Sequence, residues 1–101
     1  MSVKQIVEDN ISSNKITVFS KSWCPYCKKV KTLLKTEFPE VEAKILELDE
    51  MEDGSAIQEY LYQKTNQRTV PNVFFGEKHI GGASHITFNI MKGLLKFLNR
   101  L

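Results

Sequence analysis

The sequence predicts an α/β fold, a four-stranded mixed sheet with helices on both faces. Short apolar runs of strand length alternate with longer segments in which apolar residues recur at helical spacing. Near the end of the chain two short apolar runs follow one another across Gly76-Glu77, which predicts a hairpin. The 101 residues, 42% of them hydrophobic, suffice for one core and predict a single domain over residues 1–101.

The first half of the chain predicts a helix, a strand and a second helix. Residues 3–12 form the first helix, since apolar residues recur at helical spacing at Val3, Ile6, Val7 and Ile11. Residues 16–20 are a short apolar run, typical of a buried strand. Pro25 suits the first turn of the next helix, because a proline there leaves no donor unpaired. This helix should end at Phe38-Pro39 and turn inward Tyr26, Val30, Leu33 and Leu34.

The middle of the chain predicts a second strand and a third helix. Residues 43–48 alternate in part, and a right-handed helical crossover should make this strand parallel to the first. The next helix opens at Asp53-Gly54-Ser55 and turns inward Ile57, Tyr60 and Leu61. Asn66 follows it and suits the left-handed conformation of a C-terminal cap.

The last third predicts the hairpin and a final helix. Residues 73–75 form the third strand, which Pro71 precedes. His79-Ile80 forms the fourth strand, and Gly81-Gly82 ends it. Ser84 is then expected to cap the last helix, whose inward residues are Ile86, Ile90, Leu94, Phe97 and Leu98.

Composition excludes several function classes. A formal charge of +2 gives no support to nucleic-acid binding, and no apolar run approaches the length of a membrane span. The first ten residues lack the apolar stretch of a secretory signal. Because the cysteines form no disulfide framework, we expect a reducing compartment, the cytoplasm by default with the nucleus open. We also expect a monomer.

The two cysteines, Cys24 and Cys27, both lie in one Cys-Pro-Tyr-Cys tetrapeptide. A disulfide within one turn closes too short a loop to stabilise the fold, so the pair indicates chemistry. Cys24 begins a helix, where free backbone N–H groups, the helix dipole and the nearby Lys21 all favour its thiolate. Cys27 lies one turn further on and should stay protonated. We therefore expect Cys24 to attack and Cys27 to resolve.

A metal site is the alternative interpretation of this pair. Zinc would need four ligands, and the soft candidates are Cys24, Cys27, His79 and His85. Their spacing does not match that of zinc fingers. An iron–sulfur cluster would need ligands from a second chain or an external thiol. The position of the pair after a strand and at a helix start favours redox chemistry, and we expect no metal.

With the tetrapeptide placed, the chain resembles a dithiol glutaredoxin of the thioredoxin-like fold. The resemblance covers nearly the whole chain and is carried by Val18-Phe19-Ser20-Lys21-Ser22-Trp23-Cys24-Pro25-Tyr26-Cys27, by residues 57–61, by Arg68-Thr69-Val70-Pro71-Asn72-Val73-Phe74 and by Ile80-Gly81-Gly82. It implies glutathione as co-substrate, glutathionylated or disulfide-bearing proteins as partners, and reduction of their disulfides. It also implies a cis peptide at Val70-Pro71, although Pro71 could equally be an ordinary residue at the entry to a strand.

The resemblance implies a set of glutathione-binding residues, namely Lys21, Tyr26, Gln58, Arg68, Thr69, Val70, Pro71, Gly82, Ser84 and His85. A cation at Lys21 or Arg68 would suit the glycine carboxylate, although Arg68 could also be a plain surface charge. Gln58 has a second interpretation, because Ser55 and Gln58 match a capping box. The N–H groups at the start of the last helix would receive the γ-glutamyl carboxylate.

The chain departs from the family at His85, where relatives usually carry an aspartate. A histidine supplies no negative charge for the γ-glutamyl ammonium, so weaker glutathione affinity is expected. A solvent-facing His85 without ligand contact is the other interpretation. Trp23 is expected to form an apolar rim beside the thiols, with packing against the sheet edge as its alternative.

Two other functions remain open. One is a thioredoxin-like disulfide reductase fed by a flavoprotein, and the other is a dimeric iron–sulfur carrier.

Overall fold

The computed structural model describes residues 2–91. Its elements follow in the order α1 (Val3–Ser13), β1 (Ile16–Ser20), α2 (Pro25–Glu37), β2 (Lys44–Glu47), the short 3₁₀ turn η1 (Leu48–Glu50), α3 (Gly54–Thr65), β3 (Asn72–Phe75), β4 (Lys78–Gly81) and α4 (Ala83–Met91). Every predicted strand and helix is present, with ends that differ by one or two residues, except that the predicted end of the last helix lies outside the described residues. Within the described residues no helix is both long and apolar enough to cross a membrane.

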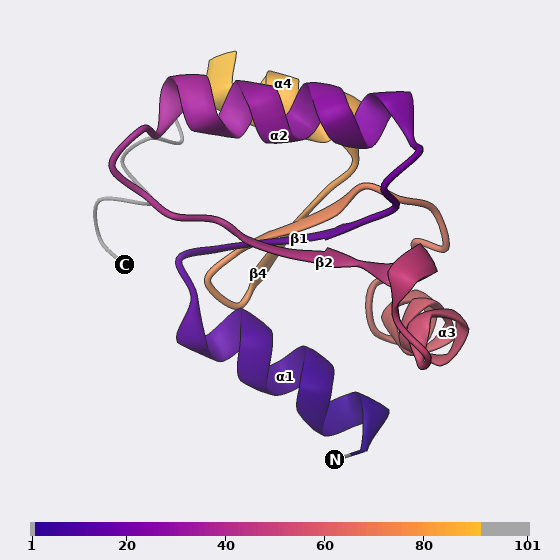
Figure 1. Cartoon of the computed structure of the whole chain (residues 1–101). Helices are drawn as coiled ribbons and strands as arrows, with labels where there is room; N and C mark the ends of the chain where they lie inside the picture. The colour runs from indigo at the N-terminus through magenta and orange to yellow at the C-terminus, as the bar shows by residue number, and fades with distance from the viewer. Residues whose placement is uncertain (1, 92–101) are drawn as a thin grey trace.

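The sheet has the strand order β2-β1-β3-β4. β1 pairs parallel to β2 and antiparallel to β3, and β3 pairs antiparallel to β4. Helices α2 and α4 cover one face of the sheet, and α1 and α3 cover the other (Figure 1). The predicted fold class and the predicted parallel pairing of the first two strands are thus confirmed.

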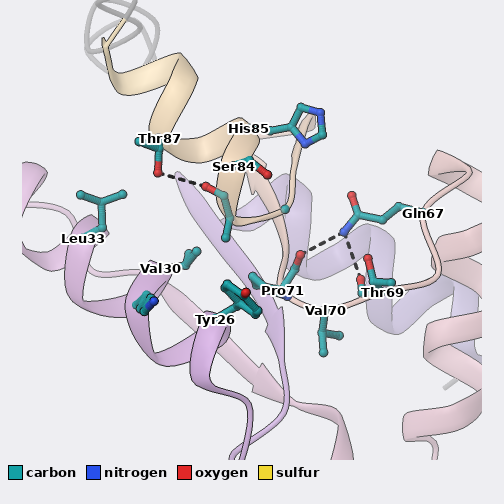
Figure 2. Close-up of a pocket in the computed structure, with 13 residues that line it drawn as sticks. Tyr26, Val30, Leu33, Gln67, Thr69, Val70, Pro71, Ser84, His85 and Thr87 are labelled. Atoms are coloured by element: carbon teal, nitrogen blue, oxygen red, sulfur yellow. Dashed lines mark hydrogen bonds between the residues drawn. The ribbon is translucent and has the colours of Figure 1, made fainter.

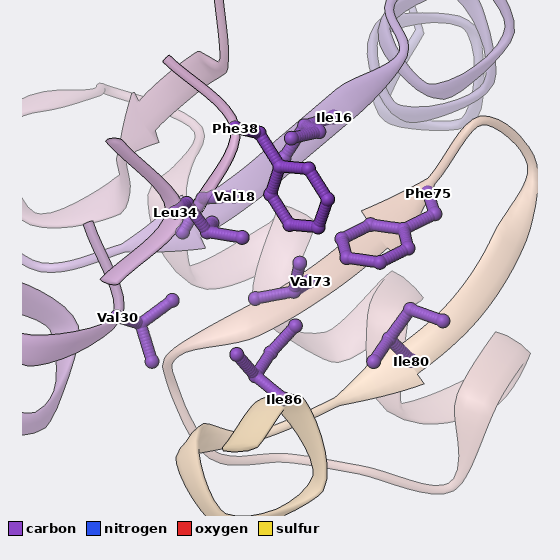
Figure 3. Close-up of a cluster of buried hydrophobic side chains, with 9 residues drawn as sticks. All are labelled: Ile16, Val18, Val30, Leu34, Phe38, Val73, Phe75, Ile80 and Ile86. Atoms are coloured by element: carbon purple, nitrogen blue, oxygen red, sulfur yellow. The ribbon is translucent and has the colours of Figure 1, made fainter. Parts of the chain in front are cut away.

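A hydrophobic cluster lies on each face of the sheet. The cluster under α2 and α4 (Figure 3) consists of Ile16, Val18, Val30, Leu34, Phe38, Val73, Phe75, Ile80 and Ile86. The cluster under α1 and α3 consists of Val7, Ile11, Phe19, Leu46, Leu48, Ile57, Leu61 and Phe74. Since successive strand residues point to opposite faces, Val18 and Phe19 serve different clusters. This explains why β1 is buried along its whole length.

The helix caps agree with the sequence in part. Asn66 adopts the predicted left-handed conformation, with φ of 65°, and its N–H donates to the Tyr62 carbonyl. The prediction for Ser84 is wrong, because α4 already begins at Ala83 and the Ile86 N–H donates to the Gly82 carbonyl. Ile86 is buried as predicted. The Ile90 side chain and residues Leu94, Phe97 and Leu98 lie outside the part that can be described.

One predicted core position is also wrong. Tyr26 was expected on the inner face of its helix, yet its side chain is 60% exposed. It lies in the first turn of α2, beyond the edge of the cluster that Val30 and Leu34 enter. Its exposure leaves the ring free to border the site described next.

Candidate active site

The two thiols occupy different environments at the start of α2. Cys24 is the N-cap residue, and its Sγ accepts a hydrogen bond of 3.3 Å from the Cys27 N–H. A free amide pointing at sulfur stabilises a thiolate there, as does the positive end of the helix dipole. Cys24 keeps 6% of its surface exposed, whereas Cys27 has none. Cys24 is therefore the thiol that a second molecule can approach.

Cys27 is held in its protonated form. Burial raises the pKa of the Cys27 thiol above its ordinary value, and the interaction with the Cys24 side chain raises that pKa further. A thiol that titrates late is a poor first nucleophile but can act once a disulfide lies beside it. The division of roles expected from the sequence thus has a physical basis in burial.

The loop before Cys24 is tied to the far end of β2. Asp49 in η1 accepts a hydrogen bond from the Ser22 N–H (2.9 Å) and another from the Ser22 hydroxyl. These bonds lower the pKa of Asp49, so the carboxylate remains charged and keeps its hold on the loop. No local pattern in the sequence indicates this contact, because Ser22 and Asp49 are far apart along the chain.

Trp23 projects from this anchored loop. Its side chain is 65% exposed, which contradicts packing against the sheet edge. Lys21 Nζ lies 5.8 Å from the centroid of the Trp23 ring, within the range of a cation–π contact. The exposed ring is available as a rim beside the thiols.

A hollow of about 760 Å³ opens between α2, the segment before β3 and the start of α4 (Figure 2). Most of the residues predicted to bind glutathione line it, namely Tyr26, Thr69, Val70, Pro71, Gly82, Ser84 and His85. They come from three separate stretches of the chain that the fold brings together. The hollow begins at Tyr26, two residues beyond the more exposed thiol.

The segment before β3 forms one wall of this hollow. The Val70-Pro71 peptide is cis, as predicted. Gln67 donates both hydrogens of its side-chain amide to this segment, one to the Thr69 carbonyl (3.0 Å) and one to the Pro71 carbonyl (2.9 Å) (Figure 2). The wall is therefore held in shape by a side chain that the sequence analysis did not single out.

The start of α4 forms the opposite wall. The amide of Ile86 makes the first backbone bond back along the chain, to Gly82, so the N–H groups of the preceding turn remain available for an anion. His85 is exposed, and its ring points away from Val30 and Leu33 in Figure 2. The ring packs over Gly81, where φ is 113° and a Cβ would lie 3.0 Å from the imidazole Nδ1. A side chain at Gly81 would disturb both the strand end and His85.

The remaining predicted residues lie outside this hollow. Lys21 and Gln58 line a separate, smaller hollow of about 220 Å³, which Trp23 also lines. Arg68 stacks on Tyr62, with its guanidinium carbon 4.0 Å from the ring centroid, and pairs with Glu59 at 3.4 Å. Both of its partners are on α3, which keeps the charge at the surface near Gln58.

The capping-box interpretation of Gln58 is wrong. The N-cap of α3 is Asp53, and Ser55 is already inside the helix. Gln58 instead donates from Nε2 to the Arg68 carbonyl at 2.6 Å. This hydrogen bond fixes the chain at Arg68, directly before the Thr69 and Pro71 carbonyls that Gln67 contacts. Whether Gln58 also binds a ligand stays a prediction.

Several residues of the large hollow were not predicted, namely Lys29, Val30, Leu33, Gln67, Ala83 and Thr87. The positions on α2 have a signal in the sequence, since Val30 and Leu33 follow Tyr26 by one and two helical turns. Gln67 has none, because its role depends on how the chain folds back after α3. Within residues 2–91 no group of three or more histidine, cysteine or acidic side chains could hold a metal ion.

Comparison with known proteins agrees with this site. The family model named Glutaredoxin matches residues 16–80. Glutaredoxin-1 of Rhizophagus irregularis is 50% identical over 83% of this chain and 81% of its own length. Glutaredoxin-2 of Schizosaccharomyces pombe is 52% identical over 82% of this chain and 74% of its own length.

Among solved structures, the buckwheat glutaredoxin–glutathione complex superposes with a TM-score of 0.88, at 42% identity, over 95% of this chain and 86% of that chain. The matched residues 16–80 include the cysteine pair and the segment before β3. The resemblance to glutaredoxins seen in the sequence is confirmed. The chain belongs to the glutaredoxin family, whose members are thiol oxidoreductases.

Proposed function

We propose that this protein is a glutathione-dependent thiol–disulfide oxidoreductase that reduces protein–glutathione mixed disulfides and protein disulfides. The observation that carries the proposal is the asymmetry of the thiols beside the large hollow. Cys24 keeps 6% of its surface exposed and accepts an amide hydrogen bond, while Cys27, one turn further into the helix, has no exposed surface. Such an arrangement favours one attacking thiolate and one resolving thiol.

The reaction with a glutathionylated protein needs only Cys24. Its thiolate attacks the glutathione sulfur, a Cys24–glutathione disulfide forms, and the protein thiolate leaves and takes a proton. The thiolate of a second glutathione then attacks the glutathione sulfur on Cys24. Oxidised glutathione leaves, and the Cys24 thiolate is restored.

The reaction with a protein disulfide also uses Cys27. Cys24 attacks one sulfur of the substrate and forms a mixed disulfide, releasing the first substrate thiolate. Cys27 then loses its proton and attacks the Cys24 sulfur, which releases the second substrate thiolate and leaves a Cys24–Cys27 disulfide. Two glutathione molecules reduce that disulfide and leave together as oxidised glutathione.

Glutathione would lie along the hollow with its sulfur toward Cys24. Its cysteine unit would pair with the backbone of Val70 as an added strand residue. Its γ-glutamyl carboxylate would reach the free N–H groups at Ser84 and His85, and its glycine carboxylate would lie toward Lys21, Gln58 and Arg68. The structure of the buckwheat relative is a glutaredoxin–glutathione complex, which supports glutathione as the ligand.

Single-cysteine variants test the mechanism. Cys24→Ser should abolish reduction of both a glutathionylated peptide and a protein disulfide, measured as oxidised glutathione formed. Cys27→Ser should keep reduction of the glutathionylated peptide and lose that of the protein disulfide. A folded Cys27→Ser variant without activity toward the glutathionylated peptide would contradict the division of roles.

Exchange of the reductant tests the dependence on glutathione. Wild-type protein should turn over with glutathione and glutathione reductase, and not with a thioredoxin reductase and NADPH. Equal rates with the flavoprotein would support the thioredoxin-like alternative. We also propose that the protein acts as a monomer in the cytoplasm, and size-exclusion chromatography together with cell fractionation would check this.

A further inference from the structure

The strongest unassigned feature near the site is the side chain of Gln67. It lines the large hollow, and its amide nitrogen donates to the Thr69 and Pro71 carbonyls at 3.0 and 2.9 Å (Figure 2). A glutamine amide has two N–H donors, and both are used here. The two acceptors flank Val70, so the contact spans the residue expected to pair with glutathione.

Val70 itself is left open by this contact. No backbone hydrogen bond within the described residues uses its N–H or its carbonyl. An extended peptide can pair with such a backbone only if the flanking peptides hold their orientation. The Gln67 amide occupies the carbonyls on either side of Val70, and the polar backbone groups of Val70 itself stay unused beside the hollow that Val70 lines.

Gln67 also lies against the opposite wall. A Cβ built at Gly82 would be 3.8 Å from Gln67 Nε2 and 3.6 Å from the Pro71 carbonyl oxygen. The amide therefore sits where the segment before β3 meets the chain entering α4. A change in its position would alter both walls of the hollow.

The main chain of Gln67 is fixed as firmly as its side chain. Its N–H donates to Thr65 Oγ1 at 3.1 Å, and that hydroxyl donates to the Leu61 carbonyl in α3. Thr65 Oγ1 also accepts from the Asn72 amide at 3.5 Å, just after Pro71. Gln67 is thus attached to α3 through Thr65, and such support holds a positioning side chain in place.

We propose that Gln67 is a positioning residue that holds Thr69–Pro71 in the shape that receives the glutathione part of the substrate. This inference rests on the proposed function. Gln67 makes no contact with the thiols in this arrangement, so it acts on glutathione recognition and leaves the nucleophile unchanged. Its loss should weaken binding of the glutathionyl group more than it slows the chemical step.

Steady-state kinetics with a glutathionylated peptide test the proposal. Gln67→Ala should raise KM for this peptide about tenfold, equivalent to about 1.4 kcal/mol, with kcat changed by less than about twofold. The matched control is Gln63→Ala, at an exposed position on α3, where the amide donates to Glu59 at 3.2 Å. This control should behave as the wild type.

Gln67→Glu supplies a readout that simple loss of stability would not move. A carboxylate would face two carbonyl oxygens and donate to neither, whereas its protonated form donates one hydrogen bond. The ratio of its KM to the wild-type KM should therefore be larger at pH 6.5, where a glutamate with the ordinary pKa of about 4.3 is ionised, than at about pH 4, where it is mostly protonated. A ratio independent of pH would overturn the proposed contact.

Alkylation of Cys24 by iodoacetamide separates recognition from damage to the fold. Its rate in Gln67→Ala should match the wild-type rate, since no glutathione takes part. A wild-type KM in Gln67→Ala, or an alkylation rate that falls together with kcat, would overturn the positioning role. Inactivity of the wild-type protein toward the glutathionylated peptide would instead overturn the proposed function.

Discussion

At the scale of single residues, the two cysteines show how position alone separates identical side chains. Cys24 lies at the N-cap of α2 and keeps a little exposure, while Cys27 lies one turn further in and has none. The sequence predicted this order from the helix start. The structure adds the hydrogen bond from the Cys27 N–H to the Cys24 sulfur and the burial that raises the pKa of Cys27.

Selective alkylation follows from this difference. In reduced protein at pH 7, iodoacetamide should modify Cys24, and peptide mass spectrometry should find Cys27 unmodified. In the Cys24→Ser variant, Cys27 should still resist alkylation at pH 7, because burial is the largest cause of its raised pKa. Rapid labelling of Cys27 in that variant at neutral pH would contradict the role of burial.

The same pKa shift has a consequence for stability. A thiol whose pKa is raised in the folded state stabilises the fold while the unfolded chain is still protonated, below about pH 8.5. That contribution of Cys27 is lost as the pH rises through its raised folded-state pKa. Cys27→Ala should therefore change the alkaline side of the stability profile more than the neutral side.

His85 is the residue at which this chain departs from its family. It is exposed in the first turn of α4, on the wall expected to receive the γ-glutamyl group. His85→Asp should lower KM for a glutathionylated peptide about two- to fivefold, because an exposed ion pair contributes at most about 1 kcal/mol. His85→Asn is the control of similar size without charge. Equal KM values for the two variants would dismiss the missing carboxylate as a cause.

At the scale of elements, the predictions failed where a helix end depends on its neighbours. Ser84 and Ser55 both suit an N-cap by residue type. In the structure Ala83 packs against the cluster under α2 and α4, and α4 therefore begins at Ala83, one residue before Ser84. Gly54 is likewise held by its N–H bond to the Met51 carbonyl, so α3 starts before Ser55. Local preference identified the helices, and packing chose their first residues.

Helices α1 and α3 are joined by a polar contact at the edge of their shared cluster. The Tyr60 hydroxyl donates to Glu8, and Lys64 pairs with the same carboxylate at 3.0 Å. The hydrogen bond lowers the pKa of Glu8 and raises the pKa of Tyr60 to about 12. Tyr60 was predicted as a core residue, and it is partly buried against the cluster under α1 and α3.

Removal of this hydroxyl tests the contact between α1 and α3. Tyr60→Phe should lower the free energy of unfolding at pH 7 by about 1 kcal/mol, measured by urea denaturation. Since the pKa of Glu8 is lowered in the folded state, the difference should shrink as the pH falls below about 4.5. Tyr62→Phe is the control on the same helix. An equal loss in both variants would rule out the Glu8 bond as the cause.

At the scale of the whole molecule, one sheet supports two clusters that touch different helices. β1 contributes side chains to both clusters, Val18 on one face of the sheet and Phe19 on the other. The site lies where elements from the two layers meet, with α2 and α4 on one face and the base of Gln67 on α3 on the other. The two layers should therefore unfold together.

Matched truncations in the two clusters test this cooperativity. Leu34→Ala on α2 and Leu61→Ala on α3 should each lower the free energy of unfolding by about 2–5 kcal/mol, since both side chains are fully buried. They lie on opposite faces of the sheet and share no cluster, so their costs should add. The exposed Thr36→Ala is the control on α2.

The shape of the transition completes that test. Far-UV circular dichroism and intrinsic fluorescence should report one coincident urea transition for each single variant. Separate transitions in Leu34→Ala or Leu61→Ala would show that the two layers unfold independently.

The sequence by itself determined the order of strands and helices and the family, and it predicted the roles of the two thiols. The order of elements depends on apolar periodicity, the family on the motifs that carry the resemblance, and the expected roles on Cys-Pro-Tyr-Cys at a helix start, all of which are local features. The tertiary structure decided the exposure of Tyr26, the first residues of α3 and α4, the tie between Ser22 and Asp49, and the contact of Gln67 with Thr69 and Pro71. The physical reason is that these features depend on which segments, distant in sequence, the sheet brings into contact, and local residue preferences do not encode those contacts.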